Sequence, residues 1–221
     1  MLLSFFFAVA LACAATRADE PDPPGELLDG IAVLVGSNRA NEAEATPILF
    51  SQLELEIDLL LVRREGVGWR QAAVDEDLRL RARREAVLVR LLARQSRQMG
   101  EKVDPTELRR DLARLEEMAG GPEVIEDLLA RHAATREDLE FWVEDALLAK
   151  QQILYMRERI DPPDEEELRR RFLSRGDGPR QQSFDRARRE LRRTVIDEQL
   201  RGALVQWLNE VRERGLVRIT N

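Results

Sequence analysis

The pattern of apolar positions divides the chain into short strands near its two ends and helices between them. Ile31–Val35 is a short, partly β-branched apolar run between two glycines, which is typical of a buried strand. Pro47–Phe50 is a second short apolar run, and Leu216–Thr220 alternates apolar and polar positions as a strand does. Because a single strand leaves its backbone hydrogen-bonding groups unpaired, we expect the two terminal strands to pair with each other or with the second run.

Capping residues, glycines and prolines mark the helices between these strands. Ser51-Gln52-Leu53-Glu54 has the spacing of a capping box, and Asp104-Pro105 combines an N-cap residue with a proline at the first helical position. The predicted helices cover residues 51–64, 75–99, 104–119, 122–131, 135–160, 164–174 and 184–214. The sequence therefore predicts a mainly α fold, with a small sheet formed by the N- and C-terminal strands.

Two long helices carry apolar residues on more than one side. In the helix 135–160, Phe141, Leu148 and Tyr155 are spaced by seven and lie opposite the main apolar face. In the last helix the apolar stripe changes side halfway, so we expect this helix to bridge two parts of a concave, cradle-like molecule. Either both faces pack on neighbouring helices, or the second face lines a groove for a peptide. The candidate peptide-binding residues are Phe141, Leu148, Tyr155, Leu200, Trp207 and Val211.

The N-terminal segment predicts export. Leu2–Ala15 is apolar but shorter than the roughly 20 residues that span a bilayer, and small residues and a proline-rich stretch follow it. We interpret residues 1–18 as a signal peptide that is cleaved after Ala18. Cleavage after Ala12 or Ala15, and retention of the segment as an anchor, are the alternatives. Cys13 is the only cysteine and gives a further alternative, a lipoprotein anchored at that residue. If the signal is removed with Cys13, the mature chain has no thiol.

Composition and single residues argue against a catalytic or nucleic-acid-binding protein. The chain has 35% charged residues and a net charge of −7, so nucleic acid is not the expected partner. His132 is the only histidine, which excludes a His-based metal site and a Ser-His-Asp triad. Glu165-Glu166-Glu167 is an acidic first helical turn, and the Gly120-Gly121 pair is a turn signal rather than a phosphate loop. We therefore expect no active site, metal or cofactor.

The order of these elements resembles that of the SurA-type periplasmic chaperones. Leu28–Gly36 is similar to the opening strand of that family, and a short return segment and a Ser-initiated helix follow it at Ile48–Glu54. Glu85–Leu108 is similar to the family's next passage, and Thr135–Trp142 and Ile160–Leu168 resemble its two following helix starts. The closing long helix and the terminal strand also match, so the resemblance covers nearly the whole mature chain.

Two departures from the family change the expected activity. The full-length relatives carry one or two parvulin-type isomerase domains before the last helix, where this chain has only residues 175–182. A domain of that kind needs on the order of 100 residues, so prolyl isomerase activity is not expected. The loop Ser37–Thr46 is also longer than the tight turn of the family.

The resemblance implies a periplasmic holdase for unfolded or extended outer-membrane polypeptides. The resulting domain prediction is a signal peptide at 1–18, a leader at 19–26, a chaperone-like region at 27–174, a linker at 175–182, and a helix and strand at 183–221 that complete the same domain. The main alternative is an assembly adaptor for one dedicated folded envelope protein, and an enzyme is the third reading. Strand-forming ends could also be exchanged between two copies in a homodimer.

Overall fold

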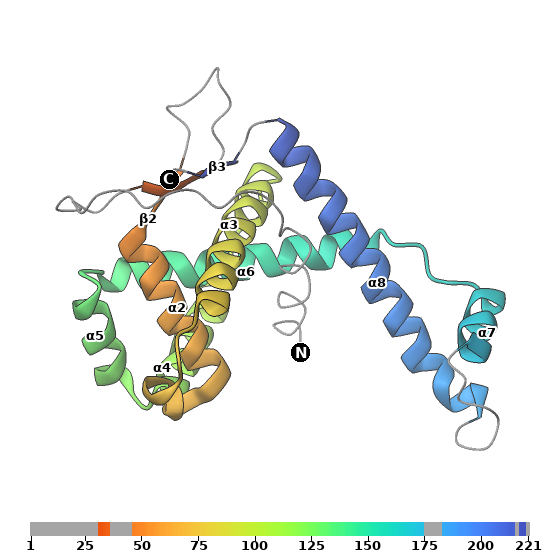
Figure 1. Ribbon diagram of the computed structural model, residues 1–221, viewed down its shortest axis with the longest axis horizontal. Helices are drawn as coiled ribbons and strands as arrows, with labels where there is room; N and C mark the ends of the chain where they lie inside the picture. Colours follow the sequence, from red (N-terminus) through yellow and green to blue (C-terminus); the bar gives the residue numbers. More distant parts are fainter. Residues whose placement is uncertain (1–30, 36–45, 175–182, 215–216, 220–221) are drawn as a thin grey trace. The chain divides into compact units, whose positions relative to one another are not determined.

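The computed structural model describes residues 31–35, 46–174, 183–214 and 217–219, which are mainly helical (Figure 1). The predicted signal peptide, Cys13 and the linker 175–182 lie outside the described residues. The described residues divide into two compact units. The first contains the chain up to Gln152 and from Val211 onward, and the second contains Ile153–Glu210. No domain boundary was predicted at these positions.

A three-stranded antiparallel sheet joins the two ends of the chain in the first unit. Its strands are β1 (Ile31–Val35), β2 (Thr46–Leu49) and β3 (Val217–Ile219), in the order β2-β1-β3. Val33 is paired with Ile219 on one side and with Ile48 on the other. The pairing of the first and last strands agrees with the expectation drawn from their unpaired backbones.

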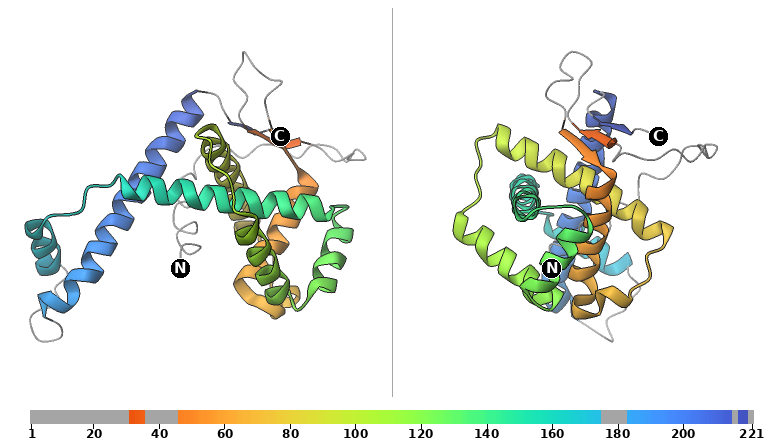
Figure 2. Two further views of the ribbon diagram at one scale, coloured as in Figure 1. Left: turned by 180° about the vertical axis from the view of Figure 1, so that it is seen from behind. Right: turned by 90° about the vertical axis from the view of Figure 1, so that its left-hand side faces the viewer.

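The helical part of the first unit begins directly after β2. Figure 2 shows α2 leading away from the sheet. The elements are α2 (Phe50–Glu65), the 3-10 helix η3 (Gly66–Gln71), α3 (Glu76–Gln98), α4 (Pro105–Ala119), α5 (Pro122–Arg131) and α6 (Arg136–Glu158), of which the end of α6 belongs to the second unit. The helix bounds lie within about two residues of the predicted ones. The short helix η3, which carries the buried Trp69, was not predicted.

Local capping explains where most of these helices start. Asp75 accepts a hydrogen bond from the backbone N–H of Leu78 at the start of α3, and Asp104 accepts one from Thr106 at the start of α4. The capping box predicted at the start of α2 is formed by residues other than the predicted Ser51 and Glu54. Gln52, rather than Glu54, accepts the reciprocal hydrogen bond, from the N–H of Leu49, because the N-cap residue is Leu49, two residues before Ser51. Glu54 forms an ion pair with Arg79 of α3 instead.

The core of the first unit lies between α2, η3, α3, α4, α5 and α6. The helix α2 contributes apolar residues from more than one side, namely Leu55, Ile57, Leu59, Leu61 and Val62. Removal of apolar area from water is the main force that holds the helices together. From α6 the core residues are Leu139, Trp142, Val143 and Leu147, all on the face predicted to pack. No helix of the described part of the chain has the length and apolar character needed to cross a membrane.

The second unit contains the end of α6, α7 (Glu165–Ser174) and most of α8 (Phe184–Glu213). Figure 1 shows α7 beside the first half of α8. Their shared core contains Leu168 of α7 and Ala187, Leu191 and Val195 of α8, and the rings of Phe172 and Phe184 meet edge to face with centroids 5.6 Å apart. The first apolar stripe predicted for the last helix is therefore a packing face.

Candidate functional site

The three residues predicted to share the second face of α6 differ in their exposure. Phe141 is 43% exposed and Tyr155 is 37% exposed, whereas Leu148 is 0% exposed. The side chain of Leu148 therefore has no solvent-exposed surface that a bound polypeptide could contact. Phe141 belongs to the first unit and Tyr155 to the second.

The candidate residues on α8 are mostly in the interior. Leu200 and Val211 are buried, and Trp207 is half-buried. The second stripe of α8 was predicted from spacing alone, and spacing cannot tell a packing face from a binding face. Of the six candidate residues, Phe141 and Tyr155 are the two that are exposed.

The ring of Phe141 is in contact with two arginines of α3. The guanidinium carbons of Arg90 and Arg97 lie 4.8 and 5.1 Å from the centre of the Phe141 ring, within the range of a cation–π interaction. Asp145, one helical turn after Phe141, contacts both arginines, with Oδ2 2.5 Å from Arg90 Nη1 and Oδ1 2.5 Å from Arg97 Nη2. We call Phe141, Arg90, Arg97 and Asp145 the Phe141 platform.

The spacing of two helices brings this platform together. Arg90 and Arg97 are seven residues apart, and Phe141 and Asp145 are four apart, so each pair lies on one face of its helix. Asp145 is 1% exposed and Arg90 is nearly buried, so their charges are compensated inside the protein rather than by water. The ring is thereby fixed in position while part of its surface stays in contact with solvent.

A second set of polar groups lies next to the platform, around Trp142. The indole N–H of Trp142 donates to the carboxyl of Glu56 on α2, and the guanidinium carbon of Arg63 lies 4.2 Å from the centre of the Trp142 ring. Glu56 is 5% exposed, and its burial raises its pKa to about 8, against the opposing attraction of Arg90. Burial also raises the pKa of Glu85 on α3 and lowers that of Arg63.

Tyr155 resembles Phe141 in having a guanidinium on its ring. The guanidinium carbon of Arg159, one turn further along the chain, lies 4.3 Å from the ring centre. Arginine also lies against Trp69, where the guanidinium carbons of Arg70 and Arg131 are each 5.5 Å from the ring centre. Phe141 and Tyr155 were predicted as candidate residues, but Arg90 and Arg97 were not, because these partners of Phe141 come from another helix.

His132 has a packed environment rather than a solvated one. It is the C-cap residue of α5, and its Nε2 lies 2.9 Å from Oδ2 of Asp58 on α2. Arg131 Nη1 lies 3.8 Å from the same oxygen. These contacts tie the end of α5 to α2.

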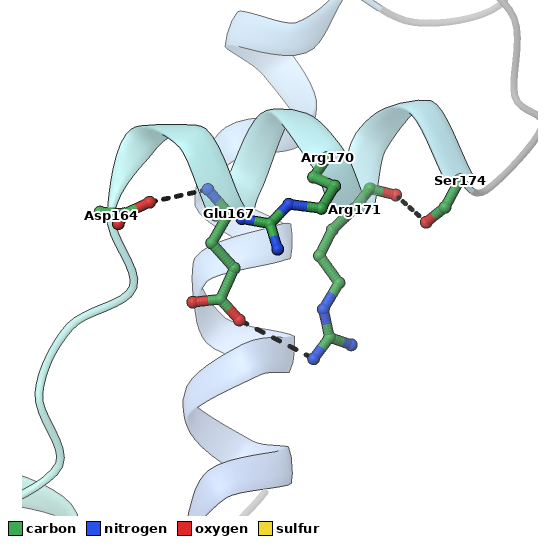
Figure 3. Close-up of a pocket in the computed structure, with 5 residues that line it drawn as sticks. All are labelled: Asp164, Glu167, Arg170, Arg171 and Ser174. Atoms are coloured by element: carbon green, nitrogen blue, oxygen red, sulfur yellow. Dashed lines mark hydrogen bonds and ion pairs between the residues drawn. The ribbon is translucent and has the colours of Figure 1, made fainter.

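An open pocket of about 440 Å³ lies on the surface of the second unit and is lined by charged and polar residues of α7 (Figure 3). Asp164 accepts from the N–H of Glu167, as an N-cap residue does, and Ser174 donates to the carbonyl of Arg171. Arg171 also lies 2.6 Å from Glu198 of α8 and 3.9 Å from Glu167. The charged groups of this pocket are therefore engaged in helix capping and ion pairs.

Acidic residues do not gather into a cation-binding group in the part of the chain that the structure describes. No three side chains of His, Cys, Asp or Glu are placed there so that they could hold a metal ion. Glu165, Glu166 and Glu167 form the acidic first turn of α7, as predicted.

Comparison with known proteins identified no relative of this chain. No protein-family model, curated protein or solved structure matches the chain. The likeness to the SurA-type chaperones is a resemblance in the order of sequence patterns.

Proposed function

We propose that the protein is a chaperone-like holdase of the periplasm, which binds unfolded or extended polypeptides of the outer membrane and does not isomerise prolyl bonds. The observation that carries this proposal is the Phe141 platform, an exposed aromatic ring held in place by two guanidinium groups. The SurA-type order of sequence elements supports the same reading.

The chemistry of the platform suits an unfolded client. Aromatic residues and arginine are enriched at protein interfaces, and they account for many of the residues that dominate binding free energy. Contact between an aromatic ring and a client side chain or peptide group has little dependence on sequence. A fixed ring also loses little conformational entropy on binding. Such a surface binds many extended chains weakly, which is the behaviour of a holdase.

The test is suppression of aggregation by the full-length protein. An unfolded, aromatic-rich outer-membrane protein and two unrelated unfolded proteins are diluted from denaturant, and their light scattering is followed with and without the protein. We expect suppression for all three clients, and no acceleration of cis–trans exchange in a proline-containing peptide. Phe141→Ala should weaken client binding by about fivefold, the equivalent of about 1 kcal/mol for a ring at an interface.

Phe50 supplies a matched control for this experiment. It is also a phenylalanine of the first unit, it is 39% exposed, and it lies at the start of α2 rather than on the platform. Phe50→Ala should leave suppression unchanged if the platform is the binding surface. Equal loss in both variants would contradict the proposal, as would a wild-type protein that suppresses no aggregation. A single tight complex with one folded envelope protein, without suppression, would favour the adaptor alternative.

A further inference from the structure

The first half of α8 carries three exposed arginines, Arg186, Arg189 and Arg192, which we call the arginine stripe. Within the described residues, no carboxylate or aromatic ring contacts their guanidinium groups. The other described arginines of the second unit all have partners. Arg157, Arg193 and Arg201 contact Asp197, Arg170 contacts Glu166, Arg171 contacts Glu198, Arg188 contacts Glu165, and Arg159 and Arg169 lie on the rings of Tyr155 and Phe184.

Helical spacing places the arginine stripe on the side of α8 that does not pack on α7. Residues three apart are neighbours on the surface of a helix, and the buried Ala187 and Leu191 lie on the other side, in the core shared with α7. The segment 184–193 contains five arginines and only two acidic residues, Asp185 and Glu190. The stripe is therefore a row of positive charge that faces solvent.

The stability of α8 does not explain the arginine stripe. Arg186 is the third residue of the helix, where the helix dipole disfavours a positive charge. Arginines three residues apart on one face also repel each other. No ion pair with a described carboxylate offsets these effects, so a negatively charged partner would relieve both.

We infer that the arginine stripe is a docking surface for a membrane that exposes anionic phospholipids. The guanidinium group carries planar, paired donors that suit a phosphate group. Protein partners are normally anchored by buried aromatic or apolar side chains, whereas the stripe offers charge alone. Charge alone is enough to attract a protein to an anionic membrane surface. The Phe141 platform belongs to the first unit, so this inference does not rest on the proposed function.

The test is sedimentation of the full-length protein with vesicles of phosphatidylglycerol mixed with phosphatidylcholine, and with vesicles of phosphatidylcholine alone. The whole chain has a net charge of −7, so binding to the anionic vesicles would report a local positive surface. We expect the wild type to bind the anionic vesicles and to be released at about 1 M salt, where charges are screened beyond about 3 Å. The triple variant Arg186→Gln, Arg189→Gln, Arg192→Gln should bind on the order of 100-fold more weakly.

A matched control replaces three exposed arginines that do have carboxylate partners, Arg64, Arg79 and Arg110, with glutamine. It changes the net charge by the same amount and should bind as the wild type does. Thermal unfolding should show the triple stripe variant to be at least as stable as the wild type, because it removes a repulsion. If the triple variant does not fold, the single variant Arg189→Gln decides the question, with an expected loss of about fivefold.

Three results would overturn the inference: no binding to the anionic vesicles, equal binding to both kinds of vesicle, or equal loss in the stripe and control variants. Binding through the apolar segment Leu2–Ala15 would give the second result, because it does not depend on the charge of the lipid. A poly-glutamate peptide tests the alternative partner. If the wild type binds this peptide through the stripe and does not bind the anionic vesicles, the surface recognises acidic polypeptides and the membrane assignment is wrong.

Discussion

Asp145 shows how much one side chain can depend on its partners. Its two oxygens each contact one arginine of α3, and the carboxylate has almost no contact with water. At the residue scale, the polar groups between α3 and α6 therefore affect stability as well as the proposed binding surface. A carboxylate in this position is stabilising only as long as both charges of each pair are present.

Asp145→Asn tests this dependence. The substitution keeps the shape of the side chain but leaves Arg90 buried without its negative partner, so we expect the free energy of unfolding to fall by about 3 to 5 kcal/mol. Urea denaturation followed by circular dichroism measures the change. Glu144→Gln is the control, because Glu144 is more exposed and lies 3.9 Å from Arg97. It should cost less than about 1 kcal/mol, and an equal loss in both variants would contradict the assignment.

Glu56 predicts a specific dependence of stability on pH. Its pKa is about 8 in the folded chain and about 4.5 without burial, so the folded state binds the proton more tightly. The stability from this group is fully present below about pH 4.5 and is lost as the pH rises through about 8. Glu56→Gln should remove this loss, so it should unfold at a higher urea concentration than the wild type at pH 9 and at a similar one at pH 4.5.

The difference between the two proteins at pH 9 should be on the order of a few kcal/mol, the size that a raised carboxyl pKa implies. Denaturation curves at several pH values give this difference directly. Parallel pH profiles for the wild type and Glu56→Gln would show that Glu56 does not titrate in the folded protein in this range.

At the scale of elements, glycines at helix ends and inside helices have opposite roles. Gly120 ends α4 with φ of 105°, a conformation that L side chains rarely adopt, and an added Cβ would lie 3.4 Å from Cγ1 of Val67. Gly202 lies inside α8, and an added Cβ would meet nothing within 4 Å. The same substitution is therefore expected to change stability in opposite directions at the two positions.

Gly120→Ala should lower the free energy of unfolding by about 1 kcal/mol, because alanine cannot easily adopt the left-handed conformation. Gly202→Ala should raise it by about 0.5 to 1 kcal/mol, because alanine restricts the unfolded chain and favours the helix. Thermal unfolding of both variants measures the two changes. A stabilising Gly120→Ala would mean that α4 does not end in the described conformation.

At the scale of the whole molecule, two hydrophobic clusters lie in different units of the described chain. One is enclosed by α2 to α6 with η3, and the other lies between α7 and the first half of α8. Leu115 is fully buried in the first core, and Leu168 is fully buried in the second. Each leucine therefore reports on the unit that contains it.

Leu168→Ala should cost about 2 to 5 kcal/mol within the second unit, because it removes apolar contact and leaves a cavity. Hydrogen exchange should rise in α7 and in the first half of α8, while α2 and α4 keep their protection. Leu115→Ala should give the opposite pattern. If either variant accelerates exchange equally in both units, the units unfold together and the division is not an energetic one.

The elements were largely predictable, because the signals that define them are local. The apolar run of β1, the cap residues Asp75 and Asp104 and the terminating Gly120 each act on a few neighbouring residues. Predictions failed where a local signal had a competitor. At the start of α2, Gln52 rather than Glu54 completes the cap, and Glu54 has an ion pair with Arg79, 25 residues away.

The candidate site was predictable only in part, for the same reason. Helical spacing placed Phe141, Leu148 and Tyr155 together, but it could not show that Leu148 is buried while Phe141 is exposed. The arginines of the platform and the buried Glu56 come from other helices. No pattern within α6 could have identified them.

The order and type of the long helices and of the strands follow from the amino-acid sequence, because capping and periodicity act over a few residues. The packing of the helices against one another selects which apolar residues face solvent and which charges share a buried site. Arg90 and Asp145 are 55 residues apart in the chain, and their 2.5 Å contact exists because α3 and α6 cross at these residues. Burial, which sets the pKa of Glu56, is likewise a property of the packed helices and not of any segment alone.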